Sequence, residues 1–178
     1  MPFTFEKIED TGLIVVTPKF FYDERGYFLE AFKKRDFAEN GINCEFAQDN
    51  VSKSKKGVLR GLHYQKAPYS QDKLVACLDG EIIDIVVDIR PESKYYKQYF
   101  KFSLTSNDRK MLYVPGGFAH GFYTISDYAV VMYKASAIYN PQADSGIIWN
   151  DPELAIEWPE GEKIISEKDL NLPKLSEL

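Results

Sequence analysis

The sequence predicts an all-β domain, an antiparallel sandwich or barrel with a few short helices. Many short runs rich in β-branched and aromatic residues follow one another, and turn residues separate them. The 178 residues contain 44% hydrophobic and 15% aromatic side chains, enough for one sizeable core. The chain contains no internal repeat, low-complexity stretch or linker, so we expect one domain over residues 1–178.

Turn residues delimit the expected elements in chain order. The Asp79–Gly80 pair is a strong hairpin signal that divides one long apolar run into two strands. Strands are expected at 12–18, 26–32, 57–65, 73–79, 81–91 and 99–105, and then at 110–125, with a turn at 115–117, and at 128–141. Helical signal is limited to a short helix at 33–41, ended by Gly41, and to single turns at 151–159 and 166–170.

Side-chain alternation assigns strand residues to faces. In residues 82–89 the odd-numbered aliphatic side chains share one face, and Asp84 lies on the other. An unpaired carboxylate among apolar neighbours is unfavourable. Asp84 is therefore expected to line a barrel interior, and the alternative is an edge strand that turns it to water. The same alternation puts His120 beside two phenylalanines and Tyr133 beside Val131.

Charge and cysteine content narrow the functional classes. The net charge of −5 gives no indication of a nucleic-acid partner. The N-terminus has no apolar leader and no run is long enough to span a bilayer, so neither a signal peptide nor a membrane association is expected. Cys44 and Cys77 lack metal-type spacing and are expected to be free thiols in a reducing cytoplasm.

Residues 51–73 carry six basic side chains and one acid, a local charge of +5. The three lysines that precede the strand are expected to face solvent. Arg60 and Lys73 differ, because they flank or enter apolar strand-like runs. A cation in such a position needs an anionic partner, and a small phosphorylated ligand is one candidate.

The chain has only two histidines, His63 and His120. Packing, metal binding and catalysis are the three competing roles. A metal is not expected, because transition-metal sites of this kind use several imidazoles plus a carboxylate. If the barrel closes, one cavity collects the groups needed for proton transfer beside a carbonyl, namely Arg60, His63, Lys73, Asp84, His120 and Tyr133.

Six ordered blocks resemble the dTDP-4-dehydrorhamnose 3,5-epimerase family, and they cover most of the chain: FYDERGYFLEAF, FAQDNVSKSKKGVLRGLHYQ, KLVACLDGEIIDIVVDIR, LYVPGGFAHGFYTISD, IYNPQADSGIIWNDPELAIEWP and ISEKD. The resemblance implies a cupin-type jelly roll that acts as a homodimer without cofactor or metal. It also implies a role in making activated L-rhamnose for bacterial surface polysaccharides.

The family reaction converts dTDP-4-dehydro-6-deoxy-D-glucose to dTDP-4-dehydro-L-rhamnose. The ketone at carbon 4 acidifies the hydrogens on carbons 3 and 5, so a base forms an enolate and an acid returns the proton on the opposite face. By resemblance, His63 is the base and Asp169 orients it. Tyr133 is the proton donor, and Lys73 stabilises the charge on the carbonyl oxygen.

The resemblance also implies how the rest of the substrate is bound. Arg25 and Arg60 match positions for the pyrophosphate, and Tyr139 matches a ring that stacks on thymine. Because the N-terminal segment of the family reaches the partner's site, Arg25 and Glu30 are expected to act in trans. The other implied substrate contacts are Phe28, Gln48, Asp49, Asn50, Asp84, His120, Asp144 and Lys168.

One residue departs from the family pattern, and three alternatives stay open. Asp72 precedes Lys73 where a small residue is expected, and it either tempers the lysine charge or faces outward. The close alternative is a single-site epimerase or ketoisomerase on a related nucleotide 4-keto sugar. The others are a sugar-nucleotide binding module without catalysis and a metal-dependent oxygenase.

Overall fold

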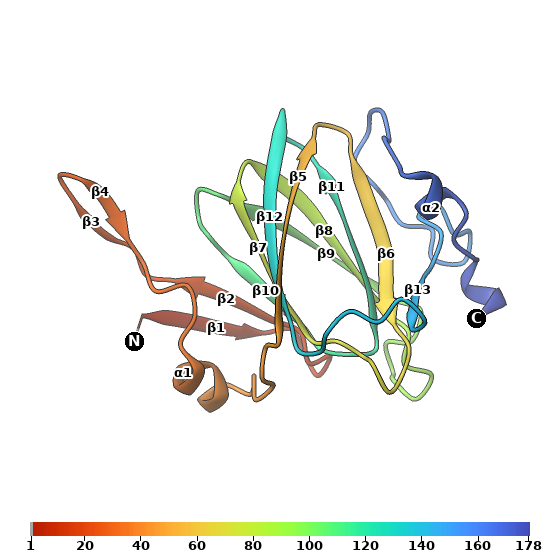
Figure 1. The fold of residues 1–178 in the computed structure, drawn as a ribbon, viewed down its shortest axis with the longest axis horizontal. Helices are drawn as coiled ribbons and strands as arrows, with labels where there is room; N and C mark the ends of the chain where they lie inside the picture. Colours follow the sequence, from red (N-terminus) through yellow and green to blue (C-terminus); the bar gives the residue numbers. More distant parts are fainter. Residues whose placement is uncertain (1) are drawn as a thin grey trace.

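The computed structural model describes residues 2–178, and two antiparallel sheets that face each other form its body (Figure 1). The six-stranded sheet has the order β1, β2, β10, β7, β12 and β5, with bounds Phe3–Lys7, Ile14–Pro18, Met111–Val114, Lys73–Asp79, Tyr128–Ala135 and Gln48–Lys55. The five-stranded sheet has the order β13, β6, β11, β8 and β9, with bounds Asp144–Gly146, Leu59–Gln65, Phe118–Thr124, Glu81–Asp88 and Tyr99–Thr105. The predicted all-β class with a few short helices is confirmed.

The main core lies between the two sheets, because alternate side chains of each strand point inward. Val86 of β8, Leu112 of β10 and Val131 of β12 are fully buried there in one cluster. The outer face of β8 carries Ile85, which packs in a separate cluster with Leu175 near the C-terminus. Both faces of β8 are therefore buried, as the apolar residues on each side of its sequence pattern indicate.

Asp84 lies inside the molecule, as its neighbours in the sequence predicted. β8 pairs with β11 on one side and β9 on the other, so it is not an edge strand. The Asp84 side chain shares the inward face with Val86 and has no exposed surface. The alternative of a solvent-facing edge position is wrong.

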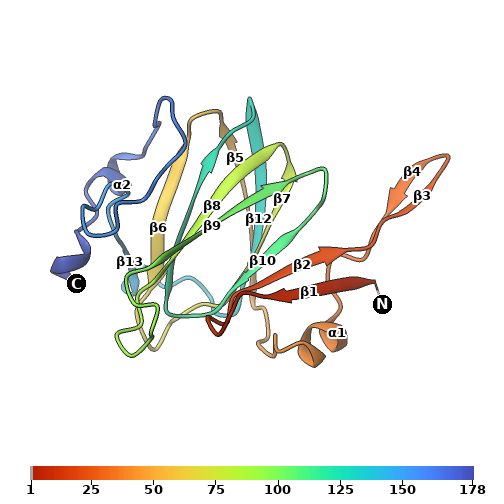
Figure 2. The same ribbon diagram turned by 180° about the vertical axis from the view of Figure 1, so that it is seen from behind.

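The N-terminal third adds a helix and a projecting hairpin. Helix α1, Lys34–Glu39, buries Phe37 on the outer face of the six-stranded sheet, and Gly41 follows it with φ +97°, as expected. β3, Phe21–Asp23, and β4, Gly26–Phe28, form a hairpin arm that extends away from the body (Figures 1 and 2). The strand expected at 26–32 ends at Phe28, because β4 pairs only with the short β3.

The C-terminal segment lies at the opposite side of the molecule from the hairpin arm (Figure 2). It contains helix α2, Glu167–Leu170, beside β6, and a 3₁₀ turn η1, Leu175–Glu177. Within residues 2–178 the helices are all too short to cross a membrane.

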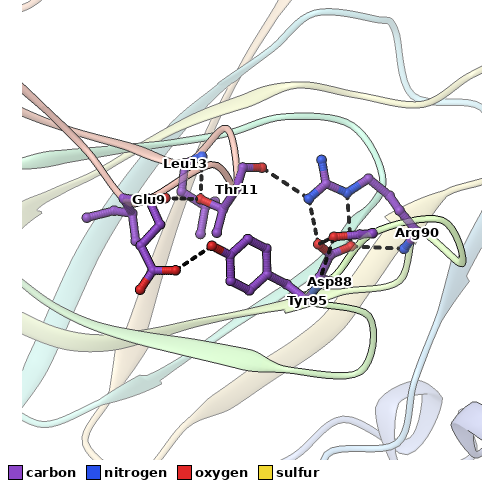
Figure 3. Close-up of polar contacts among 8 residues, drawn as sticks. Glu9, Thr11, Leu13, Asp88, Arg90 and Tyr95 are labelled. Carbon is purple, nitrogen blue, oxygen red and sulfur yellow. Dashed lines mark hydrogen bonds and ion pairs between the residues drawn. The ribbon is translucent and has the colours of Figure 1, made fainter.

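A polar cluster ties the β1–β2 turn to the connection that follows β8 (Figure 3). Arg90 Nε donates to Asp88 Oδ1 at 2.9 Å, and an Arg90 terminal nitrogen donates to the Thr11 carbonyl at 3.0 Å. The Tyr95 hydroxyl donates to Glu9. Burial alone would raise the pKa of Asp88, but the hydrogen bonds from Arg90 and a neighbouring serine outweigh it and hold that pKa below its ordinary value. The cluster is a structural cross-link away from the cavity described next.

Candidate active site

A cavity of about 320 Å³ receives side chains from both sheets and from the C-terminal segment. Five of the six residues expected to share a cavity line it. The sixth, Asp84, lies behind His120 and is bonded to its ring. Its lining residues are Ser52, Lys73 and Tyr133 from the six-stranded sheet, Arg60, His63, His120, Gly121 and Phe122 from the five-stranded sheet, and Ser166, Lys168 and Asp169 from the C-terminal segment.

A bulge in β6 decides which of its side chains face this cavity. His63 pairs with His120, and Arg60 pairs with Phe122, so three steps along β6 match two steps along β11. In a regular strand, side chains three positions apart point to opposite faces. The extra residue corrects this, because a bulge re-aims the following side chains. Arg60 and His63 therefore both line the cavity.

The bulge requires glycine at position 61, where the backbone of β6 comes unusually close to the backbone of β11. Gly61 has φ +123°, and a Cβ on it would lie 2.6 Å from the Gly121 Cα. The Gly61 N–H leaves the ladder and donates to Asp169 Oδ2 at 3.1 Å. Sequence reasoning missed this role, although a glycine inside a strand-like run is itself a signal for a bulge.

His63 forms a close pair with Asp169 at the cavity wall. His63 Nε2 lies 2.8 Å from Asp169 Oδ1, and the imidazole is 32% exposed. The Asp169 N–H donates to Ser166 Oγ, the N-cap of α2. Burial alone would raise the pKa of Asp169, but hydrogen bonds from His63 and Gly61 hold it below its ordinary value. Asp169 is therefore a carboxylate at neutral pH.

His120 forms a second pair, deeper in the molecule. Its Nε2 lies 2.8 Å from Asp84 Oδ2, and the His120 side chain is only 8% exposed. The two histidines face each other across the β6–β11 ladder, each on its own carboxylate. Within residues 2–178 no group of three His, Cys, Asp or Glu side chains is arranged to hold a metal ion.

Lys73 supplies a buried cation to the cavity. Its Nζ donates to the His63 carbonyl at 3.3 Å. Burial lowers the pKa of Lys73 to about 8, while the nearby charges of Asp84 and Asp144 act to raise it. The ammonium is thus predominantly present at neutral pH, and it titrates within the range in which enzymes are assayed.

Asp72 lies on the outer side of the sheet and does not pair with Lys73. Its carboxylate accepts a hydrogen bond from the Tyr113 hydroxyl and one from the Gly116 N–H, each at 2.8 Å. Successive side chains of an extended segment point to opposite faces, so Asp72 serves the outer side of the sheet. Of the two alternatives for this residue, the outward direction fits the structure, and its carboxylate there holds Tyr113 and Gly116.

Tyr133 approaches the cavity from the opposite sheet. It shares the inward face of β12 with Val131, as alternation predicted, and its ring lies 6.0 Å from Lys73 Nζ. Burial, together with the charge of Asp144, raises the pKa of Tyr133 above its ordinary value. The phenol therefore keeps its proton at neutral pH.

A polar group surrounds Tyr139 near the rim of the cavity. Asp144 accepts hydrogen bonds from Lys168 Nζ and from the Tyr139 hydroxyl. Gln48 accepts from the Tyr139 N–H and donates to Asn50 Oδ1, both at 2.8 Å. The expected substrate contacts at these five positions thus form one connected network.

Nine of the sixteen expected site residues do not line this cavity. Asp84 lies behind His120, and four others belong to the network around Tyr139. The remaining four lie apart from both within one chain. Arg25 and Phe28 belong to the hairpin arm, where the Arg25 side chain is 89% exposed, and Glu30 follows the arm. Asp49 turns to Lys134 on the other face of β5. The projection of the arm away from the body explains the first three, and strand alternation explains the fourth.

Several residues that line the cavity, and one that lies behind Arg60, were not predicted. Ser54 Oγ accepts from Arg60 Nε at 3.0 Å and orients the guanidinium. Ser166 could have been found as a helix cap, because it stands three positions before an acid. The remaining unpredicted lining residues are Ser52, Gly121 and Phe122.

The fold and the cavity define a cupin-type enzyme whose pocket holds the groups that proton transfer needs, a histidine–carboxylate pair, a buried lysine and a phenol. Residues 7–177 match the family model described as dTDP-4-dehydrorhamnose 3,5-epimerase, and the chain belongs to that family of isomerases. The predicted family and cupin-type fold are both confirmed.

Individual relatives agree with this assignment. The dTDP-4-dehydrorhamnose 3,5-epimerase of Methanothermobacter thermautotrophicus is 45% identical, over 98% of this chain and 96% of its own. A Legionella pneumophila 3,5-epimerase, solved in complex with dTDP-4-keto-L-rhamnose, is 40% identical with a TM-score of 0.94, over 98% of this chain and 93% of its own. A 3'-monoepimerase from Streptomyces bikiniensis, solved with dTDP-quinovose, is less similar, 30% identical with a TM-score of 0.87, over 93% of this chain and 84% of its own.

Replacing Gly61 with alanine tests the bulge. Gly61→Ala is expected to lower the free energy of unfolding by about 2–5 kcal/mol, since backbone strain and overpacking add. Gly26→Ala is the matched control, because Gly26 has φ +127° but no atom within 4 Å of a built Cβ. It should lose only about 1–2 kcal/mol. Equal losses in urea unfolding would contradict a steric need for glycine in β6.

Proposed function

We propose that this chain epimerises carbons 3 and 5 of dTDP-4-dehydro-6-deoxy-D-glucose, with His63 as base and Tyr133 as acid. One observation carries the assignment of roles: the two side chains come from facing sheets and line one cavity. Inversion requires a proton to leave one face of the sugar and return on the other. The reaction needs neither a redox step nor a metal, so no cofactor is proposed.

The His63–Asp169 pair suits proton removal. With Nε2 bonded to the carboxylate, the other ring nitrogen, Nδ1, is the one that accepts the proton. The carboxylate then stabilises the imidazolium that forms. Such acid–base assistance accelerates reactions by roughly 10²–10⁴-fold.

The electrons released at carbon 3 or 5 move to the oxygen on carbon 4. Lys73 is the proposed partner of this oxyanion, because a preorganised cation in a buried site acts more strongly than one in water. His120 contacts the sugar, and Asp84 supports both His120 and the charge of Lys73. The phenol of Tyr133 returns a proton from the opposite sheet.

The nucleotide end is assigned to the rim. Arg60, oriented by Ser54, binds the pyrophosphate, and the half-exposed Tyr139 ring stacks on thymine. Gln48, Asn50, Asp144 and Lys168 provide the polar contacts around that ring. The product, dTDP-4-dehydro-L-rhamnose, belongs to the synthesis of activated L-rhamnose for surface polysaccharides. We place the enzyme in the cytoplasm, in keeping with its two free cysteines.

A homodimer completes the proposed site. The hairpin arm exposes large aromatic side chains, with Tyr22 73% and Phe28 66% exposed, which is unusual on a monomer surface. Arg25 and Glu30 contribute nothing to their own chain's cavity. An arm that reaches the partner's cavity would bury the aromatic rings and bring Arg25, Phe28 and Glu30 to the nucleotide.

The second candidate is epimerisation at one carbon only. The structural likeness to a 3'-monoepimerase favours it, since the same barrel serves that reaction.

Solvent exchange separates these candidates. In deuterated water the wild-type enzyme should incorporate deuterium at both carbon 3 and carbon 5 of the keto-sugar. Proton NMR measures this exchange as the loss of the signals of those two hydrogens. His63→Ala should bind dTDP normally and abolish exchange at both carbons. Tyr133→Phe should keep exchange and lose inversion, because the base remains. Exchange at a single carbon in the wild type would establish the monoepimerase instead.

The titration of Lys73 should limit activity at high pH. Its ammonium is present below a pKa of about 8 and lost above it, so kcat should fall on that side. The Asp84 charge raises the Lys73 pKa, so Asp84→Asn should move this limb to lower pH. The pH profile of kcat in the variant and the wild type measures the shift. If the high-pH limb is the same in both, the Lys73 ammonium is not the group whose titration limits the reaction.

Mixed dimers test the arm. Arg25→Ala chains and His63→Ala chains should each be nearly inactive alone. Refolded together in equal amounts they should recover about a quarter of wild-type activity, since half of the dimers gain one complete site. If the arm served its own chain, mixing would restore nothing.

A further inference from the structure

The C-terminal segment that carries Asp169 is anchored by a buried carboxylate outside the cavity. Asp151 is 2% exposed, and its Oδ2 accepts the Leu175 N–H at 2.7 Å. Its Oδ1 accepts the N–H groups of Glu153 and Leu154 at 2.8 and 3.2 Å. One carboxylate thus joins the turn after residue 151 to the end of the chain. Hydrogen bonds to a charged group are the strong kind.

Leu175, whose amide is held by Asp151, packs against the residue that follows Gly61 in the β6 bulge. Leu175 is 5% exposed and packs in one cluster with Leu62, Ile147 and Leu154. Leu62 follows Gly61 in the bulge, and it exchanges backbone hydrogen bonds with Ile147 at 2.9 and 3.2 Å. The terminal segment therefore rests on the same piece of β6 that presents His63.

Only a short stretch joins this anchor to α2. Within it, the Pro173 carbonyl accepts the Ile148 N–H at 2.9 Å, so the stretch is fixed at a second point. At its other end Asp169 meets Gly61 and His63. The position of Asp169 thus depends on where residues 173–175 are held.

We infer that Asp151 is a positioning residue for proton transfer, which it serves by fixing α2 so that Asp169 meets His63. This rests on the proposed role of the His63–Asp169 pair. Asp151 does not line the cavity. Asn at this position keeps the size and one carbonyl oxygen for Glu153 and Leu154. It places an NH₂ group against the Leu175 N–H, and two facing donors repel.

Asp151→Asn is expected to lower kcat roughly ten- to hundredfold with KM nearly unchanged, because small misplacements of a catalytic group have effects of that size. Its effect should vanish in an Asp169→Asn background, where there is no carboxylate left to position. Leu175→Ala, which loosens the same anchor through packing, should show the same coupling. All rates are measured below the thermal transition of each variant.

Asp88→Asn is the matched control, the same change at a fully buried carboxylate that also accepts a backbone amide but has no bond to the C-terminal segment. It should lower thermal stability and keep kcat. If Asp151→Asn keeps kcat, or lowers it equally in both backgrounds, the inference is wrong. If Asp169→Asn is as active as wild type, the proposed role of the His63–Asp169 pair fails instead.

Discussion

The Asp169 carboxylate, shared between the Gly61 N–H and His63 Nε2, is the contact on which the site depends. One oxygen satisfies the amide that the β6 bulge removes from the ladder, and the other holds the imidazole. Without the bulge, Arg60 and His63 would point to opposite faces. Without the carboxylate, the Gly61 amide would be unpaired and the His63 ring would have no partner to fix its orientation. The same Asp169 contact therefore maintains both the β6 bulge and the orientation of the His63 ring in the proposed site.

The two histidine–carboxylate pairs look alike but differ in surroundings. The His63 imidazole is 32% exposed at the cavity wall, whereas His120 is 8% exposed and rests on the fully buried Asp84. The first arrangement leaves a ring nitrogen open to a ligand, and the second fixes a donor deep in the pocket beside the Lys73 cation. The difference in burial, not in residue type, is the reason that His63 is the proposed base and His120 a proposed sugar contact.

Much of the fold could be predicted from strand alternation and turn signals in the sequence. They located most strands, the interior position of Asp84 and the inward face shared by Val131 and Tyr133. They could not show that Arg60 and His63 share a cavity, because a bulge breaks the alternation that the prediction relies on. They could not find Asp169 either, which lies 106 residues from His63 and reads only as a helix start. Those assignments came from family resemblance, and the hairpin-arm residues enter the site only in the proposed dimer.

The tautomer of His63 is the most direct measurement, and a chain with two histidines makes it simple. Nitrogen NMR of protein labelled with ¹⁵N-histidine gives two imidazoles, which a single His120→Asn variant assigns. At neutral pH the His63 ring should carry its proton on Nε2, with Nδ1 free to accept one. In Asp169→Asn that preference should disappear. A His63 ring protonated on Nδ1 in the wild type, or unchanged in Asp169→Asn, would contradict the central role of the Asp169 contact.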